Sequence, residues 1–111
     1  MSALPTPDEF GPRDRVAFFV APALDRLECL NATFRDHAYA PHEHETFALG
    51  VIVAGCETWT TKGVRFYGRS GDFCFVNPGE VHDGAPYDGG YSYRMTYPSP
   101  ELLNRLAEDL G

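Results

Sequence analysis

The sequence predicts an all-β barrel made of two packed sheets, followed by one carboxy-terminal α-helix. Three observations support this prediction. Short apolar runs alternate with turn residues along most of the chain, one run ends in a two-residue hairpin turn, and only the last dozen residues have helical periodicity. A chain of 111 residues is one domain that can bury roughly two thirds of its unfolded surface.

The first residues of the chain, 1–14, differ in composition from the rest. They carry three prolines and several charges, so they cannot bury enough apolar surface to become ordered alone. We expect a flexible amino-terminal arm here and the barrel over residues 15–98. Residues 16–20 form a short apolar run, and residues 24–34 have the mixed pattern of one or two half-buried strands.

Two stretches of the predicted barrel carry histidines. His42 and His44 are two residues apart, so in an extended chain both imidazoles leave the same face of the sheet. Residues 71–82 end a half-buried strand in an Asn-Pro-Gly turn that delivers His82. Three histidines placed in this way indicate one site, for either a metal or a ligand.

Between these stretches the sequence predicts a buried strand over residues 47–54 and then a hairpin. Lys62 and Gly63 make the two-residue hairpin turn, which pairs Trp59 with Phe66 on one face of the sheet. We expect Trp59 to pack in the core.

After His82, residues 83–90 contain three glycines and Pro86, a composition that predicts a loop at the mouth of the barrel. The strict alternation in residues 91–97 predicts a strand with one face lining the interior. If that face is the tyrosine face, Arg94 points outwards, and the role of Arg94 stays open. The tyrosine face carries Tyr91, Tyr93 and Tyr97, for which core packing is the leading role and ligand contact the second.

Residues 99–111 have the signals of a helix. Ser99 is the predicted N-cap, Pro100 takes the first helical position, and Glu101 lies near the positive end of the helix dipole. The helix carries an apolar stripe of Leu102, Leu103, Leu106 and Leu110. This stripe needs a partner, which we expect to be the barrel or a second copy of the chain.

Charge and cysteine usage exclude several classes of function. Sixteen Asp and Glu residues oppose nine Lys and Arg residues, so an acidic surface repels nucleic-acid phosphates. Three sparse cysteines without metal-finger spacing, and the lack of a hydrophobic signal segment or membrane span, favour a reducing cytoplasm and no membrane partner. Cys74 is predicted to be a small buried hydrophobe.

The two histidine stretches resemble the two motifs of the cupin superfamily. The residues that fit these motifs are His42, His44 and Gly55 in the first, and Gly71, Gly79 and His82 in the second. Ala48 stands where the first motif has a glutamate, which removes the only anionic metal ligand of the cupin set. The resemblance implies a double-stranded β-helix, or jelly-roll, barrel.

Residues 41–45, 77–84 and 93–95 together resemble, more specifically, the amino-terminal sensor domain of the AraC family of bacterial transcription factors. The resemblance covers roughly residues 33–110. It implies a barrel that binds a small polar effector of the amino acid or sugar class, and a linker helix, beginning in residues 99–111, that dimerises. DNA binding would come only from a separate carboxy-terminal domain that this chain does not contain.

The candidate ligand-binding residues are His42, His44, His82, Tyr93, Tyr91 and Asp83. On this interpretation the protein is not an enzyme and requires no cofactor, although His42, His44 and His82 leave a divalent metal (Zn, Ni or Fe) open. The alternative is a small metal-dependent cupin enzyme, a dioxygenase or isomerase, complete in itself.

Each histidine also has a structural interpretation. His42 and His44 could be polar residues at the barrel mouth that hydrogen-bond to the backbone. His37 is predicted to lie on the surface. Asp83 and Glu80 flank His82 and could orient it, although a solvated loop acid is the expected role of Glu80.

Overall fold

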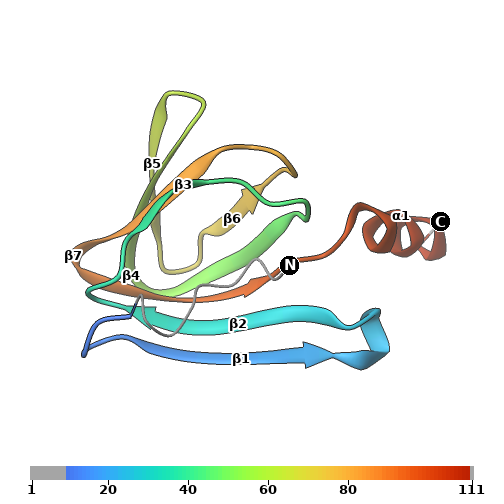
Figure 1. Ribbon diagram of the computed structural model, residues 1–111, viewed down its shortest axis with the longest axis horizontal. Helices are drawn as coiled ribbons and strands as arrows, with labels where there is room; N and C mark the ends of the chain where they lie inside the picture. Colours follow the sequence, from blue (N-terminus) through green and yellow to red (C-terminus); the bar gives the residue numbers. More distant parts are fainter. Residues whose placement is uncertain (1–9, 111) are drawn as a thin grey trace.

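The computed structural model describes residues 10–110 of the chain. Most of these residues form seven strands and one α-helix (Figure 1). In chain order the elements are β1 (Arg15–Ala21), the short 3-10 helix η2 (Pro22–Leu24), β2 (Leu27–Phe34), β3 (Tyr39–His42), β4 (Ala48–Thr61), β5 (Val64–Arg69), β6 (Phe73–Val76), β7 (His82–Thr96) and α1 (Pro100–Asp109). The predicted all-β jelly-roll barrel with one carboxy-terminal helix is confirmed.

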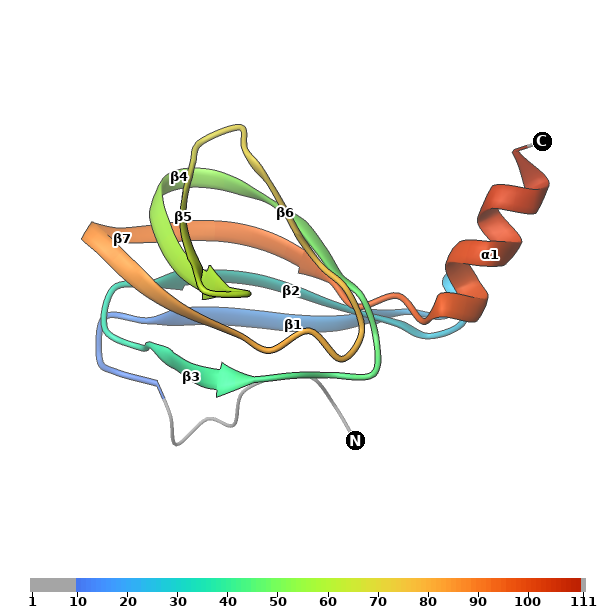
Figure 2. The same cartoon turned by 90° about the horizontal axis from the view of Figure 1, so that it is seen from above.

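The strands form one antiparallel sheet that bends over on itself. Its order is β1-β2-β7-β4-β5, with β3 added to β7 and β6 added to β4. The two longest strands, β4 and β7, each pair with several neighbours and bend, so that β3, β5 and β6 lie opposite the layer of β1 and β2 (Figures 1 and 2). The interior between these layers holds the core.

The core is built from alternate residues of β2, β4, β6 and β7. Its largest fully buried side chains are Phe34, Leu30 and Ile52. On β7 the tyrosine face of the predicted alternation points inwards and is buried, whereas Arg94 is exposed on the outer surface. The hairpin at Lys62 and Gly63 also forms as predicted, with the rings of Trp59 and Phe66 stacked at a centroid distance of 5.7 Å.

Two register shifts change which side of β4 faces the interior. Ala48 and Ile52, at even positions, are buried before the shifts, whereas Glu57 and Trp59, at odd positions, point inwards after them. Gly55 lies at the second shift with φ of +74°. A Cβ at Gly55 would stand 2.1 Å from the carbonyl oxygen of Gly90, so β4 and β7 approach closely only because this position has no side chain.

The predicted loop over residues 83–90 is wrong, because β7 runs without interruption from His82 to Thr96. Pro86 pairs in register with Glu57 of β4 on one side. On its other side, among the described residues, β3 pairs with β7 only as far as Gly84 and β2 begins to pair at Tyr91. Within the described chain, this part of β7 is therefore unpaired on one side, the kind of position in which a sheet tolerates proline.

The end of the predicted arm contacts the barrel. Residues 1–9 of this arm lie outside the described residues, but the ring of Phe10 packs 5.8 Å from the ring of Phe34 and 5.7 Å from His37. The Asp14 carboxylate accepts hydrogen bonds from the backbone N–H groups of residues 35, 36 and 37 at 2.8–3.0 Å. His37 is only 8% exposed as a result, which corrects its predicted surface position.

Helix α1 starts as predicted but leaves most of its apolar stripe uncovered. The Ser99 hydroxyl accepts a hydrogen bond from the backbone N–H of Leu102 at 3.1 Å, and Leu102 is buried. Leu106 is 38% exposed and Leu110 is 90% exposed, because the helix projects away from the barrel (Figure 2). Among the described residues, no helix is long and apolar enough to cross a membrane.

Candidate functional site

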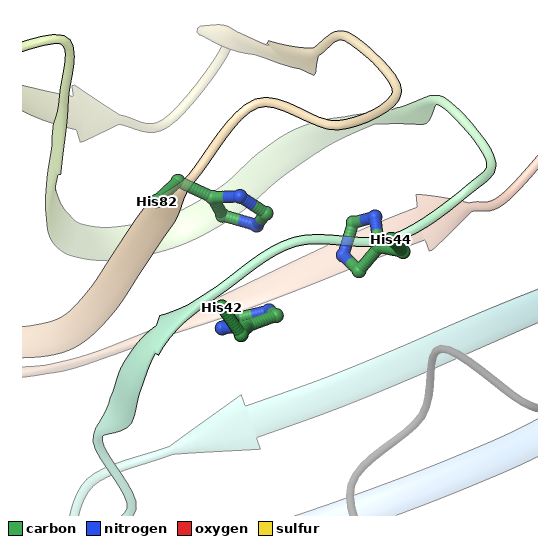
Figure 3. A group of neighbouring side chains, drawn as sticks. All are labelled: His42, His44 and His82. Atoms are coloured by element: carbon green, nitrogen blue, oxygen red, sulfur yellow. The ribbon is translucent and has the colours of Figure 1, made fainter.

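Three histidines meet at one end of the barrel. His42 ends β3, His44 follows in the next loop, and His82 begins β7 directly opposite His42 in the strand register (Figure 3). Their ring centroids are 4.4–5.3 Å apart, and one ring nitrogen from each lies within 4.8 Å of the others. The fold therefore brings together the three histidines that the sequence singles out.

Backbone carbonyl groups fix the orientation of two of these rings. Nδ1 of His42 donates to the carbonyl oxygen of Ala40 at 2.8 Å, and Nδ1 of His82 donates to that of Glu80 at 3.0 Å. Because a carbonyl oxygen can only accept, Nδ1 carries the proton and Nε2 keeps its lone pair. Both rings thus combine a hydrogen bond to the backbone with a free acceptor atom.

Burial favours the uncharged form of two of these histidines. Burial lowers the pKa of His44, and the neighbouring His82 and His42 lower it further. Burial likewise lowers the pKa of His82, although its contact with the Glu80 carbonyl opposes this shift. Neutral imidazoles are the form that accepts hydrogen bonds or binds metals at neutral pH.

A cavity of about 50 Å³ extends from the histidines into the barrel. It is lined by Tyr39, His42, His44, Ala48, Glu57, Trp59, Cys74, Val76, His82, Asp83, Tyr93, Met95 and Tyr97. Five of the six candidate ligand-binding residues are therefore at its wall, whereas Tyr91 is buried in the core behind the wall. Ala48 lines the cavity without contributing a charge.

The flanking acids have structural partners of their own. Asp83 accepts a hydrogen bond from the backbone N–H of Thr60 at 2.6 Å, which ties β7 to β4. The Glu80 carboxylate accepts from the Thr61 hydroxyl at 2.7 Å and from the backbone N–H of Asn77 at 3.0 Å, so it braces the turn before His82. It is the carbonyl oxygen of Glu80, and not either carboxylate, that holds the His82 ring.

Glu57 is a site residue that sequence reasoning missed. It lines the cavity although it is only 7% exposed, and burial raises the pKa of its carboxyl to about 8. Its Oε1 lies 3.9 Å from the thiol of Cys74, whose own pKa burial raises to about 12. The sequence feature that could have revealed Glu57 is its spacing to Trp59. Residues two apart in a strand share a face, and Trp59 was predicted to be in the core.

The three histidines fit a divalent metal as donors. Three imidazole rings with nitrogens within 4.8 Å of one another, two of the rings with Nδ1 bound to a carbonyl group, are the donor arrangement that zinc and similar ions use. Such an ion would act as a Lewis acid at this end of the cavity. The cluster does not include a carboxylate, because Ala48 provides none and Glu57 lies farther into the barrel.

Solved structures with the same fold are numerous but distant in sequence. A cupin-like protein from Thermotoga maritima is 16% identical over 90% of this chain and 79% of its own, with a TM-score of 0.72. KdgF from Halomonas sp. is 18% identical over 84% of this chain and 87% of its own, with a TM-score of 0.64. The DMSP lyase DddQ from Ruegeria pomeroyi is 18% identical over 79% of this chain and 48% of its own, with a TM-score of 0.67.

At these identities the solved structures establish the cupin-like fold and nothing finer. A comparison with curated proteins gives no match in sequence. The family model described as the AraC-like ligand binding domain, however, matches residues 26–111, which include β2 to β7, the three histidines and α1. The chain therefore belongs to the family of AraC-like ligand binding domains.

Proposed function

We propose that this barrel is the effector-binding domain of a cytoplasmic AraC-type transcriptional regulator and not an enzyme. The observation that carries the proposal is the cavity inside the barrel, in a chain that matches this ligand-binding family over residues 26–111. DNA contacts would belong to another region of the regulator, because this chain has a net charge of −7.

The cavity wall suits a small polar effector of the amino acid or sugar class. Nε2 of His42 and Nε2 of His82 are available as hydrogen-bond acceptors, and Asp83 and Tyr93 add polar atoms farther along the wall. Aromatic rings cover the apolar part of a ligand. None of these contacts requires a metal.

A ligand screen tests the proposal directly. A saturating effector is expected to raise the melting temperature, because at 100 times Kd binding stabilises the fold by about 2.7 kcal/mol. The double variant His42→Ala, His82→Ala should lose this shift, whereas the control Arg94→Ala, on the outer surface, should keep it. Equal shifts in all three proteins would show that the effector does not bind in this cavity.

A metal-dependent cupin enzyme is the second candidate, and the histidine cluster is the observation that favours it. Metal analysis of protein purified without chelator or affinity tag separates the two candidates. If our proposal is correct, the purified protein should contain much less than one metal ion per chain. Effector binding should also persist after a chelator has removed any metal. One tightly held ion per chain would contradict the metal-independent mechanism.

We propose, further, that α1 is the dimerisation element. A ten-residue helix is marginal in water, and Leu106 and Leu110 leave apolar surface exposed on it. Replacing Leu106 with Glu should therefore weaken the homodimer at least about 10-fold, since it places a charge in an apolar interface.

Sedimentation velocity across a concentration series measures this loss. The matched control is Asn104→Glu, which adds the same charge at an exposed position of the same helix. Dimerisation through another surface would be indicated if Leu106→Glu and Asn104→Glu sediment alike.

A further inference from the structure

The charged groups around the cavity have one sign. Its lining residues include two carboxyl groups, Glu57 and Asp83, and neither lysine nor arginine. An anionic group at the inner end of the cavity would find no lysine or arginine side chain in this wall to pair with.

Glu57 reaches this inner end because its neighbours leave it room. A Cβ at Gly84 would stand 2.9 Å from Oε2 of Glu57, so an alanine there would displace the carboxyl group. Asp83 is already held by the backbone of Thr60, whereas the contact of Glu57 with the Cys74 thiol is long, at 3.9 Å. Glu57 is therefore a buried acid without a cationic partner among the residues that line the cavity.

Aromatic rings form a large part of the remaining wall. Tyr39, Trp59, Tyr93 and Tyr97 all line the cavity. The faces of such rings are negative and attract cations. A volume of about 50 Å³ holds a small group only. This is the space of roughly three or four water molecules, far below the 300 Å³ or more of a drug-sized site.

We propose that the effector carries a primary ammonium group and that Glu57 is the residue that binds it. The inference rests on the proposed ligand-binding function and narrows its ligand class from polar molecules in general to small primary amines, free amino acids included. The ammonium group donates to the Glu57 carboxylate at the inner end, and the rest of the molecule extends towards His42, His44 and His82.

Binding of this kind has a proton balance that can be measured. Burial holds the pKa of Glu57 at about 8, with Asp83 and Tyr91 of β7 and Cys74 of β6 facing it, so the empty site carries a neutral carboxyl group at pH 7. An ammonium ion lowers this pKa and ionises the carboxyl group. The proton passes to the buffer, and binding at pH 7 should release close to one proton per site.

Matched ligand pairs isolate the ammonium group. L-alanine with L-lactate, L-serine with glycerate, and ethanolamine with ethylene glycol each differ by an amine and a hydroxyl at one carbon. In thermal-shift and calorimetric titrations at pH 7, the amine of at least one pair should bind at least about 10-fold more tightly than its hydroxyl partner. Calorimetry in two buffers with different ionisation enthalpies reports the released proton.

Two variants assign the effect to Glu57. Glu57→Gln keeps the size of the side chain, and Gly84→Ala keeps its chemistry but displaces it. Both should lose at least 10-fold in amine affinity while retaining the circular dichroism of the wild type, and Glu57→Gln should also abolish proton release. Amine affinity unchanged in Glu57→Gln would overturn the proposal.

The outcomes also separate this inference from the proposed function. Suppose that only hydroxy acids or polyols bind, and that the double variant His42→Ala, His82→Ala loses this binding. The effector-binding function would then stand, but the assignment of a primary amine as the ligand class would be wrong. If none of the paired ligands and no sugar binds, both the amine inference and the proposed effector-binding function are wrong.

Discussion

Replacing Phe34 with alanine is expected to lower the free energy of unfolding by about 3–5 kcal/mol. Phe34 is fully buried at the centre of an aromatic cluster. The rings of Phe10, His37, Tyr39, Tyr91 and Tyr93 surround it at centroid distances of 5.3–5.9 Å. The alanine variant loses the transfer free energy of the ring and leaves a cavity that strands on both sides hold open.

Urea denaturation followed by circular dichroism measures this loss. Phe73→Ala is the matched control, because Phe73 is 78% exposed on β6 and its truncation should change stability by no more than about 0.5 kcal/mol. A similar loss in both variants would mean that the aromatic cluster around Phe34 is not the stabilising centre of the barrel.

Replacing Gly55 with alanine is expected to cost about 2–5 kcal/mol and to impair ligand binding as well. The new Cβ would stand 2.1 Å from the carbonyl oxygen of Gly90, and φ of +74° is strained for any residue with a side chain. Relieving this contact must shift β4 against β7. Because the same irregularity turns Glu57 and Trp59 inwards, the cavity wall should shift with it.

Gly63→Ala separates the two causes of this destabilisation. Gly63 has a similar φ of +77°, but no atom lies within 4 Å of the position of a Cβ there. It should lose only the cost of the left-handed conformation, about 1–2 kcal/mol, with ligand binding intact. Equal losses in the two alanine variants would show that the close approach to Gly90 does not matter.

The sequence by itself determined the parts of this protein that depend on near neighbours in the chain. The hairpin turn at Lys62 and Gly63 and the helix cap at Ser99 were predicted, because turns and caps follow from residues within a few positions of each other. The inward tyrosine face of β7 followed from strict alternation. His42 and His44 converge as predicted, although only His42 lies in a strand. The Asn-Pro-Gly turn before His82 was visible in the sequence.

Only the tertiary structure decided the features that depend on which strands lie side by side. Pro86 is tolerated within β7 because neither β3 nor β2 pairs with this part of the strand. His37 is buried because Phe10 packs over it from another part of the chain. Glu57 enters the cavity because register shifts near Gly55 reverse the inward side of β4. Alternation along a strand predicts which side chains point inwards only where the strand keeps a regular register. The register depends on the partner strand, and the local sequence does not show which strand that is.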